Sequence, residues 1–154
     1  MSKSGTPLSS DVLPATIHGE LSLDQFVGKP LVVYFYPRDN TPGCTKQGQG
    51  FRDLHDEFQK LGCEILGVSR DKLATHEKFA TKHEFPFALI ADPDETLCRQ
   101  FDVIKEKSMY GKKVMGIERS TFLFDADGQL VREWRKVRVP GHVEEVLEAV
   151  RELG

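Results

Sequence analysis

Cys44 is the residue whose position best suits nucleophilic chemistry. It follows a continuous apolar run, LVVYFY at residues 31–36, and the short segment PRDNTPG. Thr41 is a favourable helix N-cap and Pro42 a favourable first helical residue, so we expect Cys44 in the first turn of a helix. The backbone N–H groups of that turn have no intrahelical partner, and with the helix dipole they favour a thiolate over a thiol. The sequence therefore predicts a nucleophilic sulfur at Cys44.

Arg119 is the second residue with a chemical role to consider. It stands in the segment GIERSTFLF, at the start of a predicted strand that can aim a side chain at the edge of a sheet. A guanidinium beside a thiol stabilises the ionised sulfur, and its donors can polarise an oxygen of a substrate. Sequence alone does not place Arg119 beside Cys44, and a surface ion pair is the simpler interpretation of the arginine.

The other cysteines and the histidines indicate no metal site. Cys63 and Cys98 make the cysteine count odd, and no short metal-ligand spacing joins the three thiols. This argues against a disulfide framework or a zinc site and favours a reducing compartment. The histidines are scattered singly, and each is expected to be an ordinary surface or structural residue: His18, His55, His76, His83 and His142.

The elements that must position these residues alternate between strand and helix. Apolar residues recur at steps of three and four from Cys44 until Gly62, which is typical of a helix with a glycine stop. Asp71 can cap the next helix, and Asp127-Gly128 is a turn signal between two strands. The predicted order is a strand at 31–36, a helix at 44–61, a strand at 64–69, a helix at 71–84, a strand at 87–91, a short helix at 92–101, two strands within 120–134 and a helix at 143–150.

This order predicts an α/β fold with a mixed central sheet and helices on both faces. The 154 residues suit one domain, 1–154. Residues 1–16 are expected to form a polar arm or a weakly ordered edge. Residues 104–118 are expected to form a long loop that is either functional or simply solvated. Its lysines are candidates for a partner surface, with a solvated face as the simpler interpretation: Lys105, Lys107, Lys112 and Lys113.

Composition limits the possible partners. The formal net charge of −3 disfavours general binding to nucleic acid or anionic membranes, because such binding needs a basic surface. No apolar run is long enough to span a membrane, and the N-terminal segment MSKSGTPLSSDVLPAT lacks the apolar core of a signal peptide. We therefore expect a cytoplasmic protein that binds neither nucleic acid nor membrane.

The segment YPRDNTPGCT resembles the peroxiredoxin signature, whose positions fall on Pro37, Thr41 and Cys44. The blocks GFRDLHDEF, ILGVSRD, FALIADPDETLCRQFDV and YGKKVMGIERSTFLFDADG extend the resemblance to the bacterioferritin-comigratory, or Q-type, branch over nearly the whole chain. The resemblance implies a thioredoxin-like fold and the reduction of hydrogen peroxide and organic hydroperoxides.

The same resemblance implies roles for particular residues. Cys44 would be the peroxidatic nucleophile and would be oxidised to a sulfenic acid. Thr41 and Arg119 would orient the peroxide, assisted by backbone N–H groups near Gly43 and Cys44. Pro37 would shield the pocket. Tyr36 would line the site, although its interpretation as part of the strand core is simpler.

The chain departs from this branch at the resolving cysteine. That residue is commonly five positions after the nucleophile, where this chain has Gln49, or on the next helix, where it has Ala80. Cys98 is expected to be a buried small hydrophobic residue, and Cys63 is expected at a turn where it can be exposed. Both are weak candidates for resolution. We favour a one-cysteine cycle with an external thiol; the alternative is that Ala80 replaces a native cysteine in an engineered variant.

The resemblance implies no metal, haem or flavin, since the sulfur itself carries the two electrons. The expected reductant is thioredoxin, glutaredoxin or glutathione, and the expected state is a monomer. A disulfide reductase would need a Cys-x-x-Cys pair, and its first position is Thr41 here. A peroxide-sensing or chaperone-like binding protein, oxidised once at Cys44, is a rival interpretation, and a plain structural domain is another.

Overall fold

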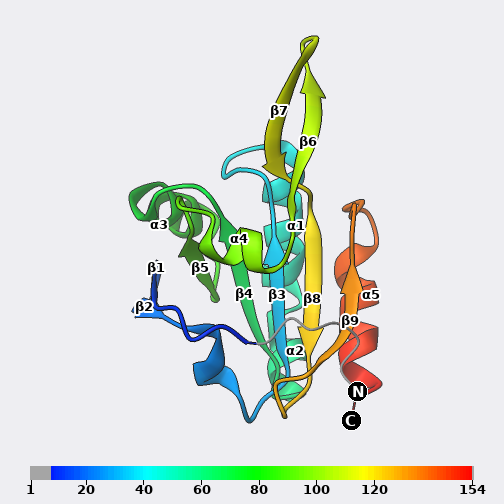
Figure 1. The fold of residues 1–154 in the computed structure, drawn as a ribbon. Coiled ribbons are helices and arrows are strands. Elements are labelled where there is room, and N and C mark those ends of the chain that lie inside the picture. Colours follow the sequence, from blue (N-terminus) through cyan, green and yellow to red (C-terminus); the bar gives the residue numbers. More distant parts are fainter. Residues whose placement is uncertain (1–7, 154) are drawn as a thin grey trace.

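A seven-stranded mixed sheet forms the centre of the computed structural model, which describes residues 8–153 (Figure 1). Its strand order is β2-β1-β5-β4-β3-β8-β9. The strands are β1 (Leu13–Ala15), β2 (Gly19–Leu21), β3 (Leu31–Phe35), β4 (Glu64–Ser69), β5 (Ala88–Ala91), β8 (Ser120–Phe124) and β9 (Leu130–Trp134). The expected mixed sheet is confirmed.

β3 occupies the middle of this sheet because all five of its residues are apolar or aromatic and are buried on both faces. It pairs in parallel with β4, which pairs in parallel with β5, and it pairs antiparallel with β8. The carboxyl ends of β3, β4 and β5 therefore meet at one edge. In that register Phe35, the last residue of β3, lies opposite Ser120, the first residue of β8.

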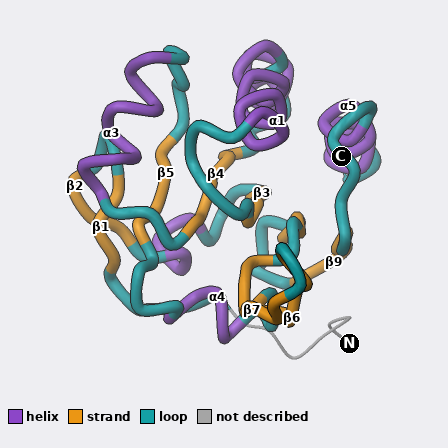
Figure 2. The backbone as a smooth tube through the Cα atoms, turned by 90° about the horizontal axis from the view of Figure 1, so that it is seen from above, coloured by secondary structure: helices purple, strands orange, loops and turns teal. Residues whose placement is uncertain are grey.

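Helices cover both faces of the sheet, as the sequence predicts (Figure 2). Four helices pack on one face of the sheet, and a short helix and a 3-10 helix pack on the other. The first group is α1 (Pro42–Asp53), α2 (His55–Lys60), α3 (Leu73–Lys82) and α5 (His142–Arg151). On the second face lie α4 (Thr96–Gln100) and η1 (Leu23–Phe26).

The helix predicted at 44–61 is in fact two helices. Leu54 ends α1 with a φ of −101° and a ψ of 7°, outside the α-helical region, and α2 starts at the next residue. The apolar stripe passes through this break, because Phe51 and Phe58 are both fully buried in the same core. Periodicity therefore identified the buried face correctly but did not indicate the bend.

The prediction of a long loop at 104–118 is wrong. This segment is a β-hairpin of β6 (Ile104–Met109) and β7 (Lys112–Ile117). Tyr110 and Gly111 form its turn, both with positive φ, which matches the twist of a two-residue hairpin. The hairpin projects from the body of the molecule, beyond the carboxyl end of β3 (Figure 1). Because solvent surrounds much of it, no hydrophobic alternation marks these strands in the sequence.

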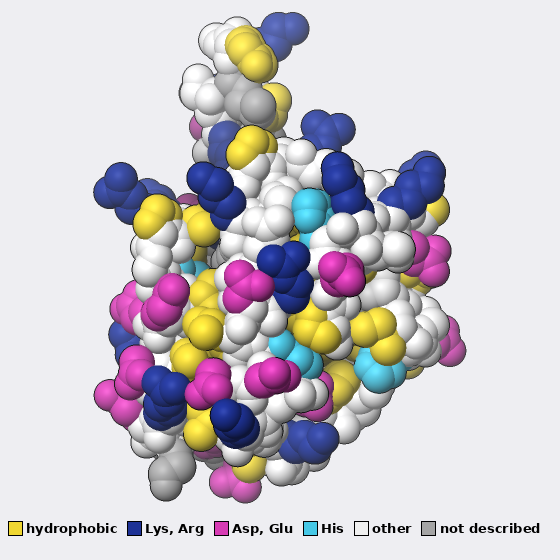
Figure 3. Space-filling view, turned by 180° about the vertical axis from the view of Figure 1, so that it is seen from behind, with side chains coloured by type: hydrophobic (Ala, Val, Ile, Leu, Met, Phe, Trp, Pro, Cys, Tyr) yellow, Lys and Arg dark blue, Asp and Glu magenta, His cyan; other side chains and the backbone are white. Residues whose placement is uncertain are grey.

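The N-terminal arm is partly structured. β1 pairs with β2, and Ala15 pairs with Ile90 of β5, so residues 13–15 belong to the sheet. Residues 1–7 of the predicted arm lie outside the described residues. Basic and acidic side chains are interspersed on the face shown in Figure 3. Within residues 8–153, none of the helices has the length and apolarity that crossing a membrane requires.

Candidate active site

The loop between β3 and α1, residues 36–41, delivers Cys44 to the carboxyl edge of the sheet. Thr41 is the N-cap of α1, with extended backbone angles, and Pro42 is its first residue. Cys44 thus lies in the first helical turn, as predicted, and only 2% of its surface is exposed. Its side chain packs in the core on the α1 face of the sheet.

Arg119 lies beside this sulfur. Its Nη2 donates to the Sγ of Cys44 at 3.3 Å, and its Nη1 donates to Oε1 of Gln47 at 2.6 Å. The register of β3 with β8 explains the meeting, because Arg119 immediately precedes the residue paired with the end of β3. Gly43 makes room for the guanidinium, since a Cβ at that position would be 3.0 Å from Nη2.

The other predicted site residues lie in or next to the β3–α1 loop. The hydroxyl of Thr41 donates to the carbonyl of Arg38 at 2.9 Å and makes no helix-capping hydrogen bond. Pro37 is half-buried and lines a surface hollow of about 340 Å³ together with Arg38 and Arg70. Tyr36 is 1% exposed, and its hydroxyl points to Asp39.

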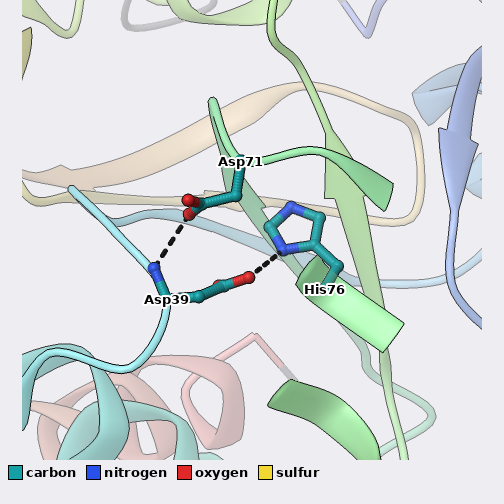
Figure 4. A group of neighbouring side chains, drawn as sticks. All are labelled: Asp39, Asp71 and His76. Atoms are coloured by element: carbon teal, nitrogen blue, oxygen red, sulfur yellow. Dashed lines mark hydrogen bonds and ion pairs between the residues drawn. The ribbon is translucent and has the colours of Figure 1, made fainter. Parts of the chain in front are cut away.

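A network of Asp39, Asp71 and His76, in which Asp39 and His76 are buried and Asp71 is half-buried, lies behind the loop (Figure 4). One possible ligand atom from each residue falls within 4.8 Å of the others, a spacing that a metal ion could use. These atoms already bond to protein groups, however. Nδ1 of His76 contacts Oδ2 of Asp39 at 2.6 Å, and Asp71 accepts from the Asp39 N–H at 2.8 Å. The structure therefore indicates a hydrogen-bond network here. It also shows that Asp71 does not cap α3, whose N-cap is Lys72.

Neither Cys63 nor Cys98 lies on the α1 face at the edge that holds Cys44. Cys63 precedes β4 and so lies at the opposite end of the parallel strands, and Cys98 belongs to the core on the other face of the sheet. Cys63 is 2% exposed, so the expectation that it can be exposed is wrong. Burial raises the pKa of Cys63 to about 12, and burial with the charge of Asp92 raises the pKa of Cys98 well above its ordinary value. Both thiols are held in their neutral form.

The two positions that lack a resolving cysteine lie on α1 and α3, respectively. Ala80 lies on α3, is 9% exposed and belongs to the same core as Cys44. Gln49 is half-buried, and its amide lies 3.4 Å from Nδ1 of His83, just after α3. Phe85 fills the space between the helices so closely that a Cβ on Gly48 would be 2.4 Å from its ring.

Gln47, His76 and Lys107 belong to the surroundings of the site, and the sequence patterns assign none of them to it. Gln47 and His76 are fully buried polar residues, and each stands within an otherwise apolar helical stripe, which is a readable signal. Lys107 comes from the hairpin and donates to the carbonyl of Ile117. Burial, and next the charge of Arg119, lower the pKa of Lys107. Lys107 lies in a segment that the sequence predicts as a loop, so no apolar pattern marks it as a residue near the site.

This arrangement allows a peroxide to oxidise the sulfur of Cys44. A thiolate is a nucleophile, and charge-assisted hydrogen bonds from a guanidinium stabilise negative charge on both the sulfur and a departing oxygen. A sheet whose parallel strands end at the nucleophile, covered by helices on both faces, is the thioredoxin-like arrangement. Fold and site together define the class of thiol-dependent peroxidases.

Comparison with known proteins identifies the family. Residues 6–133 match the AhpC/TSA family. Peroxiredoxin Bcp of Xanthomonas campestris is 52% identical over 147 residues, covering 94% of this chain and 92% of that protein. Peroxiredoxin Bcp of Bacillus subtilis is 49% identical over 137 residues, covering 88% and 87%. This chain therefore belongs to the AhpC/TSA family and, within it, to the peroxiredoxins of the Bcp type.

A solved structure supports the same fold. The bacterioferritin comigratory protein of X. campestris superposes with a TM-score of 0.90 at 48% identity, covering 97% of this chain and 98% of that one. Its description concerns alkyl peroxide reduction and a trapped intermediate and ligand complex. The predicted thioredoxin-like peroxiredoxin fold is confirmed.

Proposed function

We propose that this chain reduces hydrogen peroxide and organic hydroperoxides through a sulfenic acid on Cys44, which an external thiol then reduces. The observation that carries the proposal is the hydrogen bond of 3.3 Å from Arg119 to the Cys44 sulfur in the first turn of α1. The alkyl peroxide reduction described for the X. campestris relative supports this substrate class.

In the first half-reaction the Cys44 thiolate attacks one oxygen of the hydroperoxide. The S–O bond forms as the O–O bond breaks, the sulfur is oxidised to a sulfenic acid, and the other oxygen leaves as an alcohol or water after taking a proton. Negative charge develops on that leaving oxygen, so donors fixed beforehand around it accelerate the step. Arg119 and the backbone N–H groups near Gly43 and Cys44 are the proposed donors. The Thr41 hydroxyl, whose hydrogen goes to the carbonyl of Arg38, is proposed to orient the peroxide as an acceptor. Pro37 and Tyr36 are proposed to shape the pocket.

In the second half-reaction an external thiol attacks the Cys44 sulfenic acid, and water leaves as a mixed disulfide forms. A second thiol releases Cys44 as a thiol and takes the oxidised sulfur away as a disulfide, so each hydroperoxide consumes two thiols. This one-cysteine cycle is supported by the burial of Cys63 and Cys98 and by their positions at the other end and on the other face of the sheet.

The reductant class follows from this cycle. Thioredoxin, glutaredoxin and glutathione each supply a thiol, and a reducing compartment such as the cytoplasm supplies all three in reduced form. We propose a cytoplasmic enzyme that acts as a monomer, because Cys44, Arg119 and Gln47 come from one chain and complete the contacts around the sulfur.

Mass spectrometry of the intact protein tests the proposal. One equivalent of hydroperoxide is added with and without a trap for sulfenic acids. A trapped adduct on Cys44, and turnover when a thiol is supplied, are the expected results. A loss of two hydrogens instead would indicate a disulfide and contradict the one-cysteine cycle. A single stoichiometric oxidation without turnover would favour a peroxide sensor.

The Ala80→Cys variant is the matched comparison for this experiment. Position 80 shares a core with Cys44, so a cysteine there offers the sulfenic acid a thiol within the chain once α3 moves. We expect the variant, unlike the original chain, to lose two hydrogens after peroxide. If the original chain also formed a disulfide, the proposal that only the Ala80→Cys variant resolves the sulfenic acid within the chain would be overturned.

A further inference from the structure

Asp39, whose side chain is fully buried, anchors the middle of the β3–α1 loop. Its N–H donates to Oδ2 of Asp71 at 2.8 Å, and its Oδ1 accepts from the Tyr36 hydroxyl at 2.6 Å. The next residue, Asn40, has a φ of +65°, a left-handed conformation that asparagine adopts more readily than most residues. The contacts of Asp39 therefore tie this turn of the loop to Asp71, which follows β4.

His76 completes the attachment of Asp39. Its Nε2 lies 2.9 Å from the carbonyl oxygen of Ile90 on β5, and its Nδ1 lies 2.6 Å from Oδ2 of Asp39 (Figure 4). A carbonyl only accepts, so Nε2 carries a hydrogen. The short contact to Asp39 then requires one more proton, shared between the imidazole and the carboxyl group, and the pair as a whole is neutral.

The other partners of the Asp39 carboxyl group cannot replace His76. Burial, and next the charge of Asp39, raise the pKa of Tyr36, so its hydroxyl keeps the hydrogen that it donates. If His76 is removed, a buried carboxyl group loses its strongest partner, which is costly in a dry environment. Asp39 then moves or opens to water, and the loop that carries Pro37 and Thr41 moves with it.

We propose that His76, acting through Asp39, is a positioning residue that holds the β3–α1 loop in the conformation that receives the hydroperoxide. This inference deepens the proposed function and rests on it. His76 touches neither the sulfur nor the peroxide, and its effect reaches them through a chain of contacts: β5 to His76, His76 to Asp39, and Asp39 to the loop.

The two half-reactions separate this role from a merely structural one. Oxidation of Cys44 needs the loop in place, because Thr41, which is proposed to orient the peroxide, and the shield Pro37 belong to it. Reduction of the sulfenic acid needs a thiol to reach a residue that is 2% exposed. A loosened loop therefore slows the first half-reaction and does not slow the second, whereas partial unfolding of α3 gives no reason for such a split.

The experiment compares His76→Leu and Asp39→Ala with a conservative variant and a control. Asp39→Asn keeps an acceptor for Tyr36 and offers an amide donor to Nδ1 of a neutral His76, so it is expected to rescue the loop. Lys78→Gly weakens α3 at an exposed position and leaves the network untouched. Rates of Cys44 oxidation come from rapid mixing with hydrogen peroxide and a sulfenic acid trap, and rates of reduction from the preformed sulfenic acid mixed with glutathione.

We expect oxidation to slow by roughly 10- to 100-fold in His76→Leu and Asp39→Ala, as misplacement of reacting groups does, with reduction no slower than in the original chain. Asp39→Asn should stay within a few-fold of the original rate, and Lys78→Gly should match it. Unchanged oxidation in folded His76→Leu and Asp39→Ala would overturn the inference. So would a parallel loss in both half-reactions that Lys78→Gly reproduces.

Tyr36→Phe keeps the inference testable if the larger changes prevent folding. It removes one hydroxyl and one donor to Asp39 and preserves the aromatic packing. Oxidation should slow by a few-fold without slower reduction, and an unchanged oxidation rate would count against the positioning role. Failure of the original chain to form any adduct on Cys44 would instead contradict the proposed function, so the two failures are distinguishable.

Discussion

Arg119 and Cys44 are 75 residues apart in the sequence, and the guanidinium Nη2 donates to the sulfur at 3.3 Å. The antiparallel pairing of β3 with β8 creates this contact, because it places the start of β8 opposite the end of β3. The loop and helix that follow β3 then return the thiol to the same edge. Any change that shifts this register would separate the cation from the sulfur.

Replacement of the guanidinium should cost more activity than any other single change outside Cys44. Arg119→Met keeps much of the length of the side chain but removes its charge and donors, so we expect oxidation of Cys44 to slow by about 100- to 1,000-fold, the cost of losing a preorganised donor. The measurement is the second-order rate with hydrogen peroxide. Arg132→Met, on the exposed part of β9, is the control. A loss of less than 10-fold in Arg119→Met would contradict this role.

Gln47 should matter through Arg119. It is fully buried, and its Oε1 accepts from Nη1 of Arg119 at 2.6 Å. Gln47→Ala removes a hydrogen bond to a charged group, worth about 1.5 to 3 kcal/mol, so we expect oxidation to slow by at least about 10-fold. Gln49→Ala, two residues further along α1, removes a contact with His83 and serves as the control. Equal rates for the two variants would show that Gln47 does not hold the guanidinium.

The sequence predicted the parts of the site that are local. The continuous apolar run identified β3, and the Thr41-Pro42 signal placed Cys44 in the first helical turn. These features depend on neighbouring residues only. The meeting of Cys44 with Arg119 depends on strand register, which local patterns do not encode, and only the family resemblance pointed to it.

The features that the sequence did not predict have physical causes as well. The β6–β7 hairpin has polar residues on both faces because it extends beyond the core, so its strands lack the usual alternation. His76 occupies a buried position of α3, where an isolated histidine is more often structural than functional. Its partner Asp39 is 37 positions away, and only the arrangement of α3 against the β3–α1 loop brings the two side chains together.

The two buried cysteines should be dispensable for catalysis. Cys63→Ala and Cys98→Ala each remove a small buried side chain, so we expect a stability loss of about 1 to 2 kcal/mol and nearly unchanged turnover. Cys44→Ser should abolish turnover. The measurements are peroxide consumption with a supplied thiol, and unfolding in urea. If the folded Cys63→Ala or Cys98→Ala variant accumulated sulfenic acid and stopped turning over, that cysteine would be a resolving residue.

His142 should make the protein less stable in acid. Burial lowers its pKa to about 4, against an ordinary value of about 6.5, and its Nε2 lies 2.8 Å from the Thr121 hydroxyl. Below pH 6.5 the unfolded chain binds a proton at this histidine, and the folded protein does not until about pH 4. The free energy of unfolding should therefore fall by about 3 kcal/mol on this account as the pH falls through that window.

The His142→Gln variant isolates this contribution, because glutamine does not titrate and can still bond the Thr121 hydroxyl. Unfolding in urea, followed by the fluorescence of Trp134, gives the free energy of unfolding at each pH. The difference between the original chain and His142→Gln should change steadily between pH 6.5 and 4 and level off above and below. His18→Gln, at an exposed position, is the control substitution. A difference that stays constant across the window would mean that His142 takes up its proton in the folded protein as readily as in the unfolded chain.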